Sequence, residues 1–519
     1  MWESSIFYSK NFYKTNNYFL KSSFINKLYH YYIHKGYTNL ILIQIYNIII
    51  TVFLILYTIF IYNCIDYRKL IHINTKTRIE DIIHPYNFFN FNPILWIIII
   101  SLVLFVFVKI ICIIDDVLVF RNINFFYNRI LSINDNDLQT MQWGEIVDTI
   151  RQKYGGNTKS FDIYYICNKI TNKENYFIAM MDNNIFIIDH LTSLMEWNII
   201  FCILNYLFNQ ESQIKSDIFK KREKYLLAIQ KRIRVVSLLN FILMPFILTF
   251  IMLYNIFNYG EVFYNNPQLL VMRNYTRNTY WKFKHYNELQ HNYEARLYKS
   301  QESATRYLNQ FHNKLLDTFS RLIIFIISSI FVLFMGLSVI NQNILINLYI
   351  DNNRNVLWYV GISVSIIAIF KNFVNNTSNS NPREWIEVLN KNINLPKEWI
   401  MDANSRKTYK KLDYYFPYKI VNIFSNIFYT ILVPFQLWAL SFDVDHIMDF
   451  IIKSTVEEEN LGYVCRYSLF NKYLVNSNFL KVKNSYENFV KLYPEWKDNN
   501  LSYNSEYSIS YHKFPDLFR

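Results

Sequence analysis

The stretch YTRNTYWKFKHYNELQHNYEARL, residues 275–297, lies in the middle of the chain between long apolar runs and is rich in charged and aromatic residues. Read as a helix, it places Lys284, Glu288 and His291 on one face, since their spacing follows the helical repeat. A second, apolar face consists of Tyr286, Leu289, Tyr293 and Leu297. The simplest interpretation is an amphipathic helix packed on a core, with Lys284 and Glu288 as a solvated pair worth about 0.2–0.5 kcal/mol.

Six apolar segments surround this stretch, and they cover residues 40–61, 93–114, 235–254, 322–340, 356–370 and 427–440. The first two have 22 residues each, which as helices would measure about 33 Å, enough to cross a bilayer. Pro245 and Pro434 lie inside two of the six, and proline removes a backbone hydrogen bond and kinks a helix. We therefore predict four transmembrane helices and two re-entrant helices that enter from the cytosolic side. Six full crossings are the alternative, which would put residues 255–321 in the lumen.

The distribution of charge orients these segments. Residues 1–39 carry five lysines and one glutamate, whereas the loop 62–92 carries four basic and three acidic residues. The positive-inside rule then puts the N-terminus in the cytosol and this loop in the lumen. Residues 220–234, KKREKYLLAIQKRIR, form either a solvated face or a site for anionic headgroups. Together with the apolar runs, the net charge of +13 favours lipid over nucleic acid as a partner.

The fold class that these features predict is an all-α polytopic membrane protein with a helical cytosolic region. Its expected divisions are a cytosolic N-terminal segment (1–39), a first transmembrane pair (40–114), a cytosolic helical region (115–234), a first re-entrant helix (235–258), a cytosolic linker with the central stretch (259–321), a second transmembrane pair (322–371), cytosolic helices (372–420), a second re-entrant helix (421–441) and a cytosolic C-terminal region (442–519).

The sequence contains none of the common catalytic or nucleotide-binding patterns. The P-loop, GxSxG, HExxH and Rossmann glycine patterns do not occur. The five cysteines are scattered and form no CxxC pair, which indicates neither a disulfide framework nor a zinc site. We therefore expect no enzyme activity, no ATP-driven pump, no cofactor and no bound metal.

The segment WKFKHYNELQH, residues 281–291, resembles the signature of the autophagy-related protein nine family, a basic aromatic run followed by Asn-Glu-Leu-x-His. Further blocks resemble this family in the same order. They are NCIDY at 63–67, DLQTMQWGEIVDTI at 137–150, KENYFIAM at 173–180, EWNIIFCILNYLF at 196–208, LPKEW at 395–399 and GYVC at 462–465. The resemblance covers residues 35–469, and the order of the blocks makes it specific.

The resemblance implies an ATP-independent lipid scramblase of autophagy, assembled as a domain-swapped homotrimer with four transmembrane and two re-entrant helices. It further implies a location on Golgi-derived vesicles and the preautophagosomal membrane, with phospholipid supplied by a bridge-like lipid-transfer protein. A polar track beside kinked membrane helices would keep a headgroup hydrated while its acyl tails stay in lipid. A secondary transporter or channel, and a membrane scaffold that recruits partners, are the alternative functions.

For the lipid track we predict polar residues of the central stretch and of the neighbouring membrane segments. They are Glu261, Arg277, Lys284, Glu288, His291, Arg296, Ser363, Ser365, Lys371 and Asn426. The cations would meet lipid phosphate, while Glu288 and His291 would hold the stretch in place. The alternative role for each residue is packing of the trimer. Two positions depart from the family: Asn426 stands where a glutamate is common, and residues 264–266 are uncharged where some members carry charges.

Overall fold

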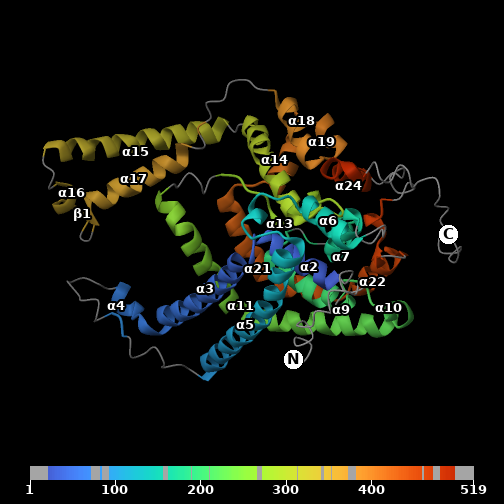
Figure 1. The fold of residues 1–519 in the computed structure, drawn as a ribbon. Coiled ribbons are helices and arrows are strands. Elements are labelled where there is room, and N and C mark those ends of the chain that lie inside the picture. Colours follow the sequence, from blue (N-terminus) through green and yellow to red (C-terminus); the bar gives the residue numbers. More distant parts are fainter. Residues whose placement is uncertain are drawn as a thin grey trace.

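The computed structural model describes residues 22–71, 82–84, 93–155, 162–186, 188, 190–209, 211–265, 272–311, 314–340, 344–351, 354–371, 374, 381–458, 461–470 and 480–496. This part of the chain is mostly helical, as the sequence predicts, and its strands form two short hairpins. Figure 1 shows a helical body from which several long helices project. The expectations for residues 1–21, for most of the loop 62–92 and for residues 497–519 lie outside the described residues.

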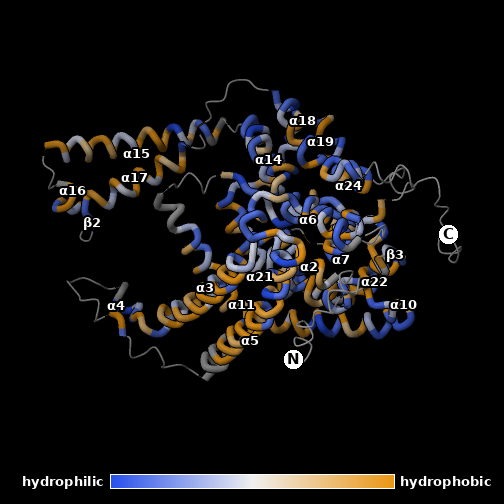
Figure 2. The backbone as a smooth tube through the Cα atoms, viewed as in Figure 1, coloured by the Kyte–Doolittle hydropathy of each residue, from blue (hydrophilic) through white to orange (hydrophobic). Residues whose placement is uncertain are grey.

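The long apolar helices fall on the six predicted segments. They are α3 (Tyr37–Cys64), α5 (Pro93–Phe125), α11 (Arg222–Asn265), α15 (Lys314–Ile340), α17 (Val356–Lys371) and α21 (Lys419–Leu440). Among the described residues, α3, α11, α15 and α21 are long and apolar enough to cross a membrane. Figure 2 shows the hydrophobic residues that run along α3, α5 and α15. The helix α5 continues past the predicted boundary at residue 114.

The two apolar segments that contain a proline, which we predicted as re-entrant helices, are each continuous helices through that proline. Helix α11 has 44 residues with Pro245 inside, and α21 has 22 residues with Pro434 inside. Figure 1 shows that α11 bends along its length, which a proline allows without ending the helix. Polar residues ahead of the apolar run extend α21 to about 33 Å, whereas α17, predicted to span, has 16 residues and measures about 24 Å. Length therefore does not separate spanning from re-entrant segments here.

The remaining helices and both hairpins build the body and the connections. The α-helices are α2 (Ser22–Ile33), α4 (Tyr67–Ile71), α6 (Trp143–Ile150), α7 (Ile163–Asp182), α8 (Ser193–Ile199), α9 (Asn205–Leu207), α10 (Asp217–Lys220), α13 (Arg277–Phe283), α14 (Gln290–Gln310), α16 (Ile344–Asn347), α18 (Pro382–Ile393), α19 (Lys397–Met401), α20 (Arg406–Tyr415), α22 (Val444–Lys453) and α24 (Leu480–Leu492). Short π- and 3-10 turns are η5 (Phe126–Leu131), η6 (Asp137–Gln139), η7 (Arg151–Gly155), η9 (Ile200–Leu204) and η10 (Arg466–Ser468). The antiparallel strands are β1 (Tyr349–Asp351) with β2 (Arg354–Asn355), and β3 (Thr455–Glu458) with β4 (Gly462–Cys465).

Helix α7 runs through the centre of the body. Its N-terminal half joins α2, α5 and α6 in one apolar cluster, and its C-terminal half joins α8, α11, α21 and α22 in another. A third cluster lies between α14, α18, α19 and α20. Because α7 is shared by two clusters, its buried polar side chains need partners from distant segments. Asn172 donates to the carbonyl of Ser212, and Asn168 donates to the hydroxyl of Ser468.

The pair α15 and α17 is set apart from the body. The two helices pack against each other, and α16 with the first hairpin closes their far end (Figure 1). Their outer surfaces are apolar and open, with Phe325 and Val332 among the exposed side chains of α15. Such a surface is typical of a helix that faces lipid or another chain.

The hairpin of β3 and β4 generates a prediction about Gly462. Its φ is +73°, and a Cβ added there would lie 2.6 Å from the side-chain nitrogen of Gln213, which donates to the carbonyl of Leu461. We expect Gly462→Ala to destabilise the chain by about 1–3 kcal/mol, because both the backbone and the space oppose a side chain. The readout is the apparent melting midpoint in detergent.

The matched control is Gly144→Ala in α6, where the nearest atom would lie 3.7 Å from the new Cβ. Alanine favours a helix over glycine by about 1 kcal/mol, so this change should leave the midpoint unchanged or raise it. Equal shifts in the two variants would contradict the explanation.

Candidate functional site

The central stretch is not one helix, so the prediction of a single helical face is wrong. Helix α13 ends at Phe283, α14 begins at Gln290, and the six residues between them are not helical. Asn287 has a φ of +58°, a left-handed conformation that interrupts the helix. Asn175 of α7 holds Asn287 there, since its side chain accepts from the backbone N–H of Asn287 at 3.0 Å and donates to its side-chain oxygen at 2.9 Å.

Glu288 is the anchor of this turn. Its carboxylate accepts two hydrogen bonds from the guanidinium of Arg296, at 2.8 and 2.7 Å, and one from Asn488 of α24 at 3.2 Å. It also accepts from the backbone N–H of His285 at 3.0 Å. The side chain of Glu288 is 1 % exposed and that of Arg296 is 11 % exposed. Arg296 uses its other donors on the carbonyls of Phe283 and Asn392. The pair is therefore buried and almost fully hydrogen-bonded.

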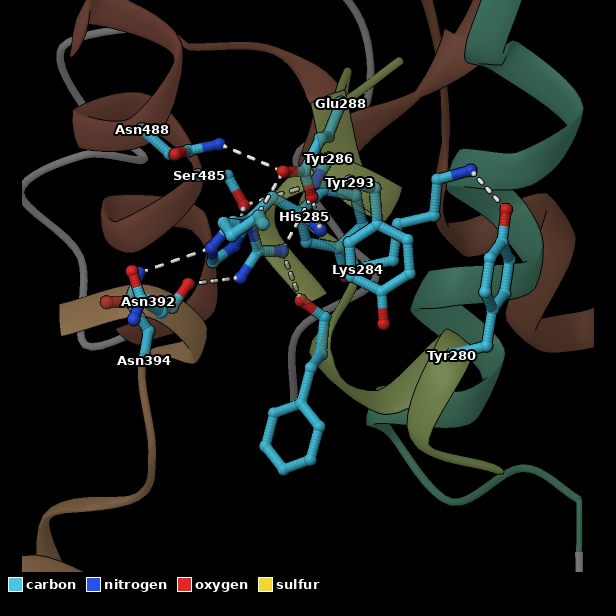
Figure 3. Close-up of polar contacts among 12 residues, drawn as sticks. Tyr280, Lys284, His285, Tyr286, Glu288, Tyr293, Asn392, Asn394, Ser485 and Asn488 are labelled. Carbon is cyan, nitrogen blue, oxygen red and sulfur yellow. Dashed lines mark hydrogen bonds and ion pairs between the residues drawn. The ribbon is translucent and has the colours of Figure 1, made fainter. Parts of the chain in front are cut away.

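Lys284 is fully buried, so the predicted solvated pair with Glu288 is also wrong. Its ammonium group lies 2.9 Å from the carboxylate of Glu174 on α7 and 3.4 Å from the hydroxyl of Tyr280. Figure 3 shows the contact with Tyr280. Burial lowers the pKa of Lys284, but the attraction of Glu174 and Tyr280 outweighs burial and the pKa is raised. Lys284 is therefore a cation held inside the body by a carboxylate from a distant segment.

Two histidines complete this cluster as neutral groups. His285 lies between the side chains of Asn394 and Ser485, and burial, with the nearby cations Arg296 and Lys481, holds its pKa well below the usual value. Nδ1 of His291 forms a hydrogen bond of 2.9 Å with the hydroxyl of Tyr29 on α2. Burial, with a smaller contribution from Lys35, lowers the pKa of His291 to about 4. Four predicted track residues, Lys284, Glu288, His291 and Arg296, thus lie together inside the body.

A second polar group lies where α8 and α13 meet the apolar helices α11 and α21. Arg277, at the start of α13, forms a bidentate ion pair with Glu196 of α8. The side chain of Arg277 is 43 % exposed, whereas that of Glu196 is 8 % exposed. The side chain of Asn278 accepts from the backbone N–H of Leu191 at 2.7 Å, which ties α13 to the segment before α8. Arg277 therefore faces outward from a buried carboxylate.

The same group extends onto both apolar helices. His190 contacts the side-chain oxygen of Asn426 on α21 at 3.0 Å. Asn240 of α11 donates to the side-chain oxygen of Asn198 on α8 at 3.2 Å, and Ser237 donates to the carbonyl of Pro434 at 2.7 Å. The structure thus brings the predicted Arg277 and Asn426 into one region. We call the set Glu196, Arg277, His190, Asn426, Asn198 and Asn240 the membrane-side polar group.

The other predicted residues lie elsewhere. Ser363 and Ser365 are on α17, where their hydroxyls donate to the carbonyls of Tyr359 and Gly361 in the preceding turn. Lys371 is the last residue of α17. Glu261 lies within α11, but its side chain is outside the described residues, as are the side chains at 264–266. In the described part of the chain, no three His, Cys, Asp or Glu side chains come together as a metal site.

Sequence reasoning missed His190 and Glu196. Glu196 belongs to the block EWNIIFCILNYLF, which we used only as evidence of the family resemblance. A charged residue at the start of an apolar segment is itself a signal of a functional polar site, and it could have identified Glu196. His190 carried no such signal, because its partner Asn426 is 236 positions away.

Comparison with known proteins gives consistent matches. A sequence model of the family described as "Autophagy protein ATG9" matches residues 21–471. Autophagy-related protein 9 of Vanderwaltozyma polyspora is 28 % identical over 513 residues, covering 93 % of this chain and 52 % of the relative. Its counterpart from Saccharomyces cerevisiae is 29 % identical over 480 residues, covering 86 % and 47 %. The chain thus spans about half the length of the curated relatives that it matches.

A solved structure also resembles this fold. The cryo-EM structure of Schizosaccharomyces pombe Atg9 is 25 % identical, with a TM-score of 0.67. The match covers 89 % of this chain and all of that chain.

The Glu288–Arg296 pair generates a stability prediction. Glu288→Gln removes the negative charge and leaves Arg296 buried and uncompensated, which costs about 3–5 kcal/mol. The expected result is a large drop in the apparent melting midpoint. Glu302→Gln, on α14, removes the partner of Arg306 from an exposed pair and should cost about 1 kcal/mol or less. Similar losses in both variants would refute the proposed role of burial.

His291 generates a pH prediction. The folded pKa of about 4 lies below the value of ~6.5 for an unfolded histidine, so the unfolded chain binds more protons between these values. This stabilisation is complete above pH 6.5 and is lost as the pH falls toward 4. His285 acts in the same direction. Melting midpoints between pH 7.5 and 5 should fall less steeply in His291→Gln than in the wild type, while His446→Gln, at an exposed position, keeps the wild-type slope.

Proposed function

This chain belongs to the ATG9 family of autophagy proteins, and we propose that it is an ATP-independent phospholipid scramblase that equilibrates lipid between leaflets as the autophagosome membrane grows. The observation that carries the proposal is the membrane-side polar group. It places the 43 % exposed side chain of Arg277 next to a buried imidazole and buried amides, beside two long apolar helices. Polar side chains in that position lower the cost of moving a charged headgroup out of bulk water.

The chemistry of the group fits a phospholipid headgroup. Arg277 offers guanidinium donors that suit phosphate, and Glu196 keeps the guanidinium in place from its buried side. Asn426 and Asn240 add neutral donors and acceptors along α21 and α11. None of these groups supplies energy, so the movement of lipid runs in both directions until the leaflets are balanced. The buried cluster around Glu288 has little capacity left for lipid, and we assign it a positioning role.

The wider assignments belong to this proposal as well. We infer a domain-swapped homotrimer, which the apolar outer surface of the α15 and α17 pair supports. The four-plus-two arrangement of membrane segments, the Golgi-derived vesicles and preautophagosomal membrane as the location, and the bridge-like lipid-transfer partner follow from the family. Within the trimer, α15 and α17 would pack on a neighbouring chain, and Ser363, Ser365 and Lys371 would contribute to a track shared between chains.

The test uses the full chain reconstituted in vesicles with fluorescent phospholipid in both leaflets and an impermeant quencher outside. The wild type should quench well beyond half of the fluorescence without ATP. Arg277→Gln should slow the second half roughly tenfold, the equivalent of about 1.4 kcal/mol. Asn426→Leu should slow it as well, without leaving a buried charge. Arg383→Gln, in an exposed pair on α18, is the matched control and should behave as the wild type.

Quenching that stops at half with the wild type would overturn the scramblase proposal. Flux that requires an ion gradient would favour the transporter alternative. Normal autophagy in cells that carry Arg277→Gln and Asn426→Leu variants with no scrambling would favour a scaffold. Elution of each variant as the same species as the wild type separates loss of activity from loss of assembly.

A further inference from the structure

A short apolar segment lies beside α11. It consists of α8, η9 and α9, residues Ser193–Leu207, and it is too short to cross a membrane. One side is buried in the body through residues such as Met195 and Cys202. The other side carries Trp197, 58 % exposed, and Phe201, whose rings stack at 5.1 Å with an interplanar angle of 4°. The segment thus holds two aromatic rings, in a fixed arrangement, on the surface.

Contacts with α11 fix the level of these rings. The last charged residue of the first part of α11 is Arg234, and residues 235–260 carry no formal charge. Asn198, next to Trp197, pairs with Asn240, whereas Phe201 lies against Arg232. The short segment therefore runs antiparallel to α11. Measured along the axis of α11, Trp197 therefore lies about 9 Å beyond Arg234, on the uncharged side. Phe201 lies at the level of Arg232, within the charged part of the helix.

Arg232 contacts the Phe201 ring, and two further basic residues lie within one turn of it on α11. The guanidinium of Arg232 lies 5.1 Å from the centre of the Phe201 ring and donates to the Phe201 carbonyl at 3.2 Å. Lys231 is exposed beside it. Arg234 lies 5.7 Å from the ring of Phe442, which is itself exposed. Among the described residues, no carboxylate is within ion-pair distance of Lys231, Arg232 or Arg234, so their charge is not neutralised locally.

We propose that Trp197 and Phe201 form an interfacial anchor in the cytosolic leaflet, and that Lys231 and Arg232 hold an anionic phospholipid headgroup beside it. Indole rings favour the level at which headgroups meet acyl chains, because one end of the ring is apolar and the other can donate. Juxtamembrane cations attract anionic lipid at that level. The exposed side chains of Leu238, Leu239 and Ile242 continue the apolar surface along α11 into the membrane.

The charge of the patch favours lipid over a second copy of the chain. The chain carries a net charge of +13, so a second copy brings more positive than negative charge to this patch, whether the contact is twofold or part of a trimer. An anionic leaflet supplies the opposite charge and apolar chains together. This inference does not depend on scrambling, since an anchor would serve any membrane protein of this shape.

The first test measures depth. In a Cys112→Ser background, where the other four cysteines are buried, Trp197→Cys carries a spin label in the full chain reconstituted in vesicles. The label should collide with oxygen, which dissolves in the acyl region, and be protected from a water-soluble paramagnetic complex. The matched control is Lys224→Cys, on the exposed basic part of α11, which should show the reverse pattern.

Free access of the water-soluble reagent to the label at position 197 would overturn the anchor. Dipolar broadening between labels at 197, with protection from both reagents, would show that a second copy covers the patch and would also overturn it.

The second test measures lipid selectivity. Chains extracted from vesicles of phosphatidylcholine and phosphatidylserine are delipidated stepwise, and the retained phosphatidylserine is counted by mass spectrometry. Lys231→Gln with Arg232→Gln should lower retention, by about fivefold for each charge. Lys231→Gln alone leaves the contact between Arg232 and Phe201 intact and should lower phosphatidylserine retention by about fivefold. Lys220→Gln with Lys224→Gln removes as much charge farther from the membrane and should retain wild-type amounts. Equal losses in the two double variants would overturn the headgroup site.

Discussion

The need to neutralise charge inside the body shapes this fold more than any other constraint. An unpaired ion in a protein interior is far more costly than a pair that is fully hydrogen-bonded. Glu288 and Arg296 meet that requirement together, and their remaining bonds reach α18 and α24. Lys284 meets it through Glu174 on α7. The polar interior therefore links segments that lie about 100 to 200 positions apart in the sequence.

The polar residues divide into two classes with different capacities. Around Glu288, donors and acceptors are matched within the protein, so the cluster positions the helices and has little left to offer a ligand. On the membrane side, Arg277 is held on one side and open on the other. The proposed scrambling uses the second class, since only groups with unused donors can exchange water for a headgroup. The first class keeps the second in position through α13, which is the element they share.

Much of the architecture could be predicted from apolar runs, since long uncharged segments have few other uses, and the family could be predicted from the order of short blocks. The turn at residues 284–289 could not, because it depends on the left-handed Asn287 and on Asn175, which lies far along the chain. The full extent of α11 could not either, because the charged residues before its apolar run continue the helix back to Arg222. Of the predicted site, Arg277 and Asn426 share a region, while Lys284 and Glu288 lie in the interior.

The separation of the α15 and α17 pair from the body has a consequence for how such a chain changes over evolutionary time. Residues of the pair contribute almost nothing to the interior around α7, so a replacement there alters what the molecule adheres to and leaves its own architecture intact. A replacement at Asn175 or Glu288 has the opposite character. Substitutions can thus change what the projecting helices bind while the central body stays the same, so the two parts of the chain can diverge at different rates.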